Sequence, residues 1–134
     1  MIDVRFNRVM GLTWIVCFVA MSVTDLRAQE AAMNTLTEAE QAAGWTLLFD
    51  GETMAGWRGY MMDSMPEGWD VVDGALVRVG PTRDIITTEI FRDFELSIDW
   101  NVDPGGNSGI FYRAVEGPEQ IYFAAPEMQV LDDA

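Results

Sequence analysis

The sequence predicts an all-β protein, an antiparallel β-sandwich, and three features of its pattern support this class. Short apolar segments recur between turn residues from Trp45 to the end of the chain. The segment Phe94–Trp100 alternates apolar and polar residues without a break, which is typical of a strand with one buried face. No helical period appears after Gly44. Many short strands with frequent turns favour two packed antiparallel sheets.

A short helix is expected before the first of these strands. Thr37 and Glu40 have the spacing of a capping box, in which each side chain bonds the backbone N–H of the other residue. Gly44 is a suitable helix stop. These signals predict a helix over Glu38–Ala43, within a leader of residues 29–43, followed by a strand over Trp45–Phe49.

The dipeptide Asp73-Gly74 predicts a tight hairpin. It separates two β-rich segments by two residues, which is a strong signal for a type I′ turn. We therefore expect strands over Trp69–Val72 and Ala75–Val79. Four further strands are expected at residues 85–88, 94–100, 109–114 and 127–131.

The first 28 residues have the pattern of a secretory signal peptide. Arg5 and Arg8 provide the positive charge, Met10–Val23 is a mostly apolar segment, and Ala28 is a small residue at the expected cleavage point. The apolar segment is short for a membrane span, which needs about 20 residues. We expect export to the periplasm or the medium, with no membrane association beyond the signal peptide.

The charge of the chain restricts its partners and its chemistry. The formal net charge is −14, and the sequence contains no histidine. An acidic surface repels phosphate backbones, so nucleic acid is excluded as a partner, whereas neutral sugars are compatible. Without histidine, acid–base chemistry would depend chiefly on carboxylates. The single cysteine lies in the predicted signal peptide, so the remaining chain forms no internal disulfide.

The segment Glu127–Leu131 offers a carboxylate and an amide on one face of a strand. Period-two geometry places Glu127, Gln129 and Leu131 together, opposite Met128 and Val130. An ordinary solvent-facing strand has the same pattern, and the pattern alone favours that interpretation. A functional strand would use the carboxylate as an acid or base on a sugar.

The segment PGGNSGIFYR raises a similar choice. Asn107 and Ser108 could meet sugar hydroxyls, or they could bond only the backbone of their own turn. Gly109 allows a ligand or a neighbouring backbone to approach closely. Arg113 shares the parity of Gly109, so it would bond Glu127 or a substrate hydroxyl if the two strands are neighbours.

Several blocks of the chain resemble the 3-keto-disaccharide hydrolase family. GWTLLFDGETMAGWRG, GWDVVDGALV, DFELSIDW, PGGNSGIFYR and PEMQVLDDA occur in the family's order, and the resemblance covers Gly44–Ala134. It implies an exported bacterial protein with a concanavalin A-like jelly roll. It also implies that residues 44–134 are the N-terminal part of the domain, so we expect the natural protein to continue beyond Ala134.

The resemblance implies hydrolysis of a glycoside whose C3 hydroxyl is oxidised to a ketone. Glu127 is then the candidate acid/base, and Asp132 a second acid/base, metal ligand or orienting group. The candidate substrate-binding residues are Asn107, Ser108, Arg113 and Gln129. The expected partner is a small carbohydrate, and no cofactor is evident. The sequence leaves open the oligomeric state and a divalent metal, for which Asp132 is the possible ligand named above. A non-catalytic carbohydrate-binding module and a structural surface domain are the competing interpretations.

Overall fold

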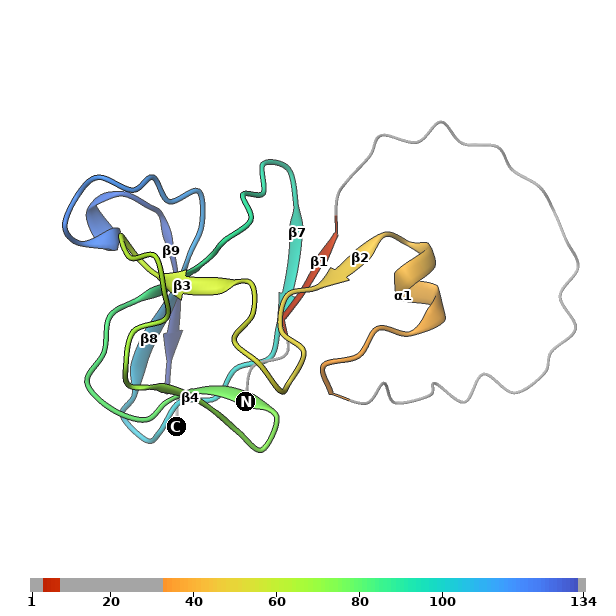
Figure 1. Ribbon diagram of the computed structural model, residues 1–134, viewed down its shortest axis with the longest axis horizontal. Coiled ribbons are helices and arrows are strands. Elements are labelled where there is room, and N and C mark those ends of the chain that lie inside the picture. The colour runs from red at the N-terminus through yellow and green to blue at the C-terminus, as the bar shows by residue number, and fades with distance from the viewer. Residues whose placement is uncertain (1–3, 8–32, 133–134) are drawn as a thin grey trace, which may run out of the picture.

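The computed structural model describes residues 4–7 and 33–132, and this part of the chain is almost entirely strand and turn (Figure 1). All strand pairs are antiparallel, in one three-stranded sheet of order β2-β1-β7 and in the pairs β3-β6, β4-β5 and β8-β9. The predicted all-β class is confirmed, in an arrangement consistent with a sandwich. The elements are β1 Val4–Asn7, α1 Glu38–Ala42, β2 Trp45–Leu47, β3 Trp57–Gly59, β4 Trp69–Val72, β5 Ala75–Arg78, β6 Ile85–Thr87, β7 Glu95–Ile98, β8 Asn107–Phe111, the 3₁₀ helix η1 Ile121–Phe123 and β9 Glu127–Leu131.

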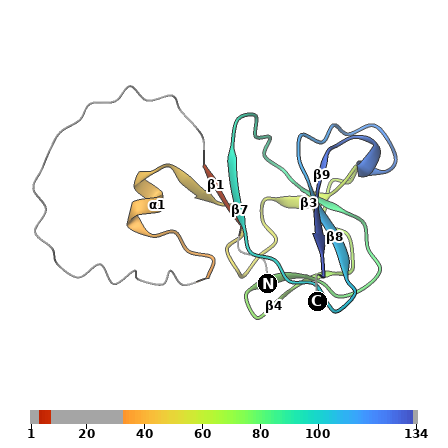
Figure 2. The ribbon, with the colours of Figure 1, turned by 180° about the vertical axis from the view of Figure 1, so that it is seen from behind.

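The order of the elements in space differs from their order in the sequence, because β7 pairs with β1 although β3 to β6 lie between β2 and β7 in the chain. Figures 1 and 2 show α1 and β2 at one end, the β1 and β7 strands beside them, and the β8–β9 pair with the loop that carries η1 at the opposite end. The strand β3 crosses the direction of β8 and β9 in both views. The β8–β9 pair therefore lies far from the helix.

The helix α1 begins at the predicted capping box. The Glu40 carboxylate accepts a hydrogen bond from the Thr37 N–H at 2.7 Å, and the Thr37 hydroxyl accepts one from the Glu40 N–H at 3.2 Å. Gly44 follows the C-cap with φ of 86°, a conformation that glycine adopts without a Cβ clash. The predicted helix is confirmed, one residue shorter than expected.

The hairpin β4–β5 has the predicted turn. Asp73 and Gly74 have φ of 50° and 76°, so both central residues are left-handed, as a type I′ turn requires. The Asn34 side chain donates from Nδ2 to the Gly74 carbonyl at 2.7 Å and so ties the turn to the segment that precedes α1.

Strand β3 was not expected from the sequence. Its three residues follow Gly56 and include only one large apolar side chain, Trp57, so no alternation is visible. The Trp57 indole donates from Nε1 to the Leu48 carbonyl at 2.7 Å, which joins β3 to the end of β2. Trp57 is half-buried, in agreement with a packing role.

Strand β1 lies within the predicted signal peptide. Its backbone pairs with β2 and β7, with Phe6 opposite Thr46 on one side and Leu96 on the other. Most of the predicted signal peptide, residues 8–28, lies outside the described residues. A chain processed after Ala28 would lack β1, so β2 and β7 would lose the strand between them.

The core is small and is built from separate elements. Six apolar side chains are buried in the part of the chain whose side chains the structure describes, and they come from loops, a hairpin, the 3₁₀ helix and β9: Phe49, Tyr60, Ala75, Leu76, Ile121 and Val130. Of the two residues on the predicted apolar face of β9, Val130 is buried and Met128 is 46% exposed, so only Val130 joins the core. Within residues 4–7 and 33–132, no helix has the length and apolar character needed to cross a membrane.

Candidate functional site

The β8–β9 pair brings most of the predicted site residues onto two neighbouring strands. The register places Gly109 opposite Gln129, Phe111 opposite Glu127 and Asn107 opposite Leu131. Residues directly opposite each other in an antiparallel pair project to the same face. The register therefore places Glu127 and Gln129 on the same face as Asn107.

Glu127 and Gln129 are hydrogen-bonded neighbours on this face. With its amide oriented to satisfy both polar groups, Gln129 donates from Nε2 to Glu127 Oε1 at 3.1 Å and to the Ser108 carbonyl at 3.2 Å. Both side chains are exposed. The amide fixes one carboxylate oxygen and leaves the group open to solvent and to a ligand.

Asn107 and Ser108 are the first two residues of β8, and strand alternation separates their side chains. Asn107 shares the face of Gln129, whereas Ser108 lies opposite Val130 and shares its face. Both residues are exposed at the end of the pair farthest from Glu127. The strand thus begins two residues earlier than expected, and only Asn107 joins the carboxylate face.

Arg113 lies beyond the end of β8. The strand ends at Phe111, and Arg113 has φ of 55°, so the expected strand to Ala114 is wrong and the predicted parity does not extend to this residue. The Tyr112 N–H still bonds the Pro126 carbonyl at 3.2 Å, which keeps Arg113 near the end of the pair that carries Glu127. Among the described residues no hydrogen bond or ion pair joins Arg113 to Glu127.

Asp132 lies away from Glu127 and has a structural contact of its own. Its carboxylate accepts a hydrogen bond from the Gly105 N–H at 2.6 Å, and its own N–H bonds the Gly106 carbonyl at 3.2 Å. Five residues of extended chain place it roughly 16 Å from Glu127 along β9. The two carboxylates therefore do not form a pair, and Asp132 holds the loop that leads into β8.

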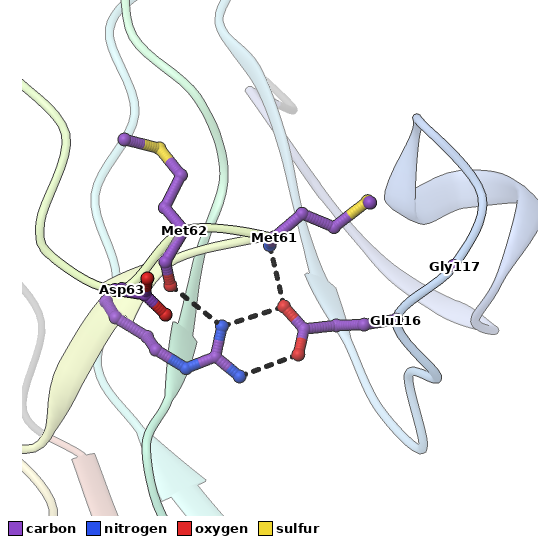
Figure 3. Close-up of a pocket in the computed structure, with 6 residues that line it drawn as sticks. Met61, Met62, Asp63, Glu116 and Gly117 are labelled. Carbon is purple, nitrogen blue, oxygen red and sulfur yellow. Dashed lines mark hydrogen bonds and ion pairs between the residues drawn. The ribbon is translucent and has the colours of Figure 1, made fainter.

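An open pocket of about 490 Å³ lies beside this strand pair, at the loop between β8 and η1 (Figure 3). The Arg58 guanidinium and the Glu116 carboxylate form two hydrogen bonds of 2.7 Å within it. The Met61 N–H donates to the same carboxylate at 2.6 Å, and Figure 3 shows the Met61 and Met62 side chains extending away from the ion pair. The pocket is lined by Arg58, Met61, Met62, Asp63, Glu116 and Gly117, none of which is a predicted site residue.

The electrostatics of this pocket favour a structural role for Glu116. The Arg58 guanidinium and the Met61 N–H lower the pKa of the Glu116 carboxyl from 4.5 to about 2. A carboxylate with so low a pKa remains ionised at neutral pH and is a poor general base. The Glu127 carboxylate is exposed to solvent and forms no ion pair among the described residues, so it remains the candidate that a substrate can reach.

Comparison with known proteins identifies the family. The model of the "3-keto-alpha-glucoside-1,2-lyase-like domain" matches residues 44–134, which include the whole β8–β9 pair. The chain belongs to this family. A curated relative from Bacteroides thetaiotaomicron, "3-keto-disaccharide hydrolase", is 39% identical over 122 residues, covering 77% of this chain and 42% of the relative. The chain thus spans less than half the length of that relative.

The family resemblance inferred from the quoted blocks is confirmed. The match begins at Gly44, after α1, as the first block GWTLLFDGETMAGWRG indicates. In this member of the 3-keto-alpha-glucoside-1,2-lyase-like family, PGGNSGIFYR supplies β8 and PEMQVLDDA supplies β9. These two blocks therefore lie side by side in the fold.

The described part of this family member offers no clear metal centre. It contains no group of three or more acidic or cysteine side chains close enough to hold a metal ion. The Asp50 carboxylate accepts bonds from Glu52 N–H, Thr53 N–H and the Thr53 hydroxyl. These bonds lower the pKa of Asp50 to about 2, and the bond from the Thr53 hydroxyl has the largest effect. They also close the turn after β2.

Two features near the candidate site were not predicted from the sequence. Tyr122 and Phe123 of η1 are 58% and 75% exposed, with ring centroids 4.6 Å apart. Two adjacent aromatic residues, five and four positions before the candidate base, could have suggested a surface on which sugars stack. The Arg58–Glu116 pair could not have been found from local pattern, because 58 positions separate its members.

Proposed function

We propose that this domain cleaves 3-keto-disaccharides or related 3-keto-glycosides by elimination, with Glu127 as the base. The observation that carries the proposal is the exposed face of β8–β9, where the Glu127 carboxylate is held beside the Gln129 amide, with Asn107 farther along the same face. The family description names a 1,2-lyase, and the relative is named as a hydrolase of 3-keto-disaccharides. Both names fit a base acting at C2 of a 3-keto sugar.

The chemistry follows from the ketone. A carbonyl at C3 acidifies the C2 hydrogen, and a carboxylate can remove that proton while the electron pair forms an enolate over C2, C3 and the ketone oxygen. The enolate then expels the C1 substituent: the C3 carbonyl re-forms, a C1–C2 double bond forms, and the bond from C1 to the departing oxygen breaks. That oxygen takes the proton that Glu127 removed from C2. Addition of water across the C1–C2 double bond gives the 3-keto monosaccharide, so the net reaction is hydrolysis.

The remaining candidates act on the sugar rather than on the proton. We assign Asn107 and Gln129 to hydrogen bonds with sugar hydroxyls, since both amides lie on the face of Glu127. Arg113, at the Glu127 end of the pair, is suited to the negative charge that develops on the enolate oxygen. We assign Asp132, whose carboxylate accepts from the Gly105 N–H, to holding the preceding loop rather than to proton transfer.

The test is turnover of a 3-keto-disaccharide by the protein expressed from its complete reading frame. Glu127→Gln keeps the size of the side chain and removes the base, so we expect kcat to fall about 10²–10⁴-fold. Glu119→Gln, which changes an exposed carboxylate on the adjacent loop, is the matched control and should retain full activity. Near-normal turnover by Glu127→Gln would exclude Glu127 as the base.

The exposed aromatic residues favour one alternative, a non-catalytic carbohydrate-binding module. Tyr122 and Phe123 present their rings to solvent, and such rings can bind sugars by stacking. A binding module would show saturable sugar binding without release of monosaccharide. Release of a 3-keto monosaccharide by the wild-type protein would favour the enzyme.

We also propose that the protein is exported. The support is the pattern of residues 1–28, with charge at Arg5 and Arg8 and a small residue at Ala28. The expected mature N-terminus is Gln29. N-terminal sequencing of the protein from the periplasm or medium tests this, and a mature chain that still begins at Met1 would contradict it.

A further inference from the structure

The Glu127 side chain lies directly over Gly109 of the neighbouring strand. A Cβ placed on Gly109 would overlap Glu127 Oε1 and would lie 2.5 Å from its Cδ and 2.7 Å from its Cγ. Real Cβ atoms do not approach other atoms this closely. The space that a side chain at position 109 would need is therefore occupied by the carboxylate.

This glycine is not required by the backbone. Gly109 lies within β8, and it is not among the described residues with positive φ. Any L-residue can adopt such an extended conformation, and glycine weakens a strand because it adds chain entropy. The sequence suggested that a ligand or a neighbouring backbone approaches Gly109. In the structure, the Glu127 side chain does so.

The carboxylate is held from a second direction by Gln129. The Gln129 Nε2 donates to Glu127 Oε1 and also to the Ser108 carbonyl, so the amide is itself anchored to β8. Among the described residues, nothing donates a hydrogen bond to Oε2 of Glu127. One oxygen is thus fixed against the strand pair, and the other is available to a substrate.

We propose that Gly109 is a positioning residue for Glu127. Its lack of a Cβ lets the carboxylate lie flat across β8, where Gln129 fixes Oε1 and presents Oε2 to the C2 hydrogen of the sugar. This inference depends on the role proposed for Glu127 as the base. Gly109, the third glycine of PGGNSG, then serves the reacting carboxylate and not the turn.

A methyl group at position 109 would move the carboxylate rather than the strand. The clashing atoms are the far end of a flexible side chain, whereas β8 is held to β9 by a ladder of five residue pairs. Gly109→Ala therefore keeps the charge of Glu127 and changes only its place. A misplacement of about 1 Å can cost about 10²-fold in rate, because proton transfer requires close contact.

The experiment measures kcat and KM for a 3-keto-disaccharide with Gly109→Ala in the protein expressed from its complete reading frame. We expect kcat to fall about 10- to 100-fold, KM to change by less than about threefold, and Tm to be unchanged or higher. Gly80→Ala is the matched control, since a Cβ there would meet its nearest atom, Gly68 Cα, at an ordinary 3.9 Å and needs no positive φ. The control should keep wild-type kcat.

A comparison of double and single variants shows whether Gly109 affects turnover through Glu127. If Gly109 acts through Glu127, Gly109→Ala has no further effect on the residual turnover of Glu127→Gln. If Gly109→Ala fails to fold, Glu127→Ala removes the side chain that a Cβ at position 109 would meet, so Gly109→Ala should fold in that background. Failure to fold there as well would show that the glycine serves the strand and not Glu127.

Two further outcomes overturn the inference in distinguishable ways. Wild-type kcat in a folded Gly109→Ala, or a full further loss when it is added to Glu127→Gln, would show that Gly109 does not position Glu127, while the base assignment stands. Near-normal turnover by Glu127→Gln alone would remove the proposed base, and the positioning role with it.

Discussion

Arg58 and Glu116 form two hydrogen bonds of 2.7 Å between segments that are far apart in the sequence. Arg58 belongs to β3, and Glu116 to the loop between β8 and η1. The Arg58 guanidinium also donates to the Met62 carbonyl at 3.1 Å, so the same group fixes the turn after β3. A bidentate pair of this kind restricts orientation as well as distance. The loop that leads from β8 towards Glu127 is therefore held against β3.

We expect the Glu116 carboxylate to make stability depend on pH. Its pKa is lowered to about 2 in the folded protein, so its stabilising effect is complete above its usual pKa of 4.5 and is lost as pH falls towards 2. Glu116→Gln should lower Tm at pH 7 and match the wild type near pH 2. Thermal unfolding at a series of pH values checks this.

Salt provides a second check on this pair. Both side chains are partly exposed, so screening at high ionic strength should reduce the difference between Glu116→Gln and the wild type at pH 7. Glu119→Gln on the same loop is the control and should show a much smaller difference. A Tm gap that is equal at pH 7 and pH 2 would contradict the role of the charge.

The Tyr60 hydroxyl should contribute to the same attachment. Tyr60 is 3% exposed, and its hydroxyl donates to the Pro118 carbonyl at 2.9 Å. Tyr60→Phe keeps the ring and leaves that carbonyl unsatisfied, at a cost of about 1 kcal/mol in unfolding free energy. Urea unfolding measures it. Tyr112→Phe, at a 42% exposed position, should unfold like the wild type, and equal losses in the two variants would argue against the Pro118 bond.

Gly74 should resist substitution because its conformation is left-handed. Its φ is 76°, and a left-handed L-residue costs about 1–2 kcal/mol, so Gly74→Ala should lower the free energy of unfolding by that amount. The midpoint of urea unfolding should fall with its slope unchanged. Gly80→Ala, which makes only ordinary contact, should show no such loss. Equal stability of the two variants would contradict the strain at the turn.

Asp132 should prove to be an anchor for the loop before β8. Asp132→Asn keeps an oxygen that can accept the Gly105 N–H, so we expect kcat within about threefold of wild type, since general-base removal costs far more. Asp132→Ala loses that acceptor and should lower Tm. A loss of turnover in Asp132→Asn as large as that in Glu127→Gln would instead make Asp132 a catalytic residue.

The sequence alone determined those features whose cause is local. The capping box of Thr37 and Glu40, the Asp73-Gly74 turn and the bounds of Glu127–Leu131 each depend on residues within a few positions, and each is confirmed. The family blocks also lie in continuous segments, so the family was visible before the fold. Short β3 was missed because three residues are too few to show a period.

Only the tertiary structure decided how the candidate residues meet. The β8–β9 register brings the Glu127 carboxylate over Gly109, places Ser108 on the other face and leaves Asp132 with the loop at Gly105. The end of β8 at Phe111 puts Arg113 outside the strand. These outcomes depend on which strands pair and on where pairing stops. Pairing is a contact between distant segments, and a shift of one residue would move every side chain to the opposite face.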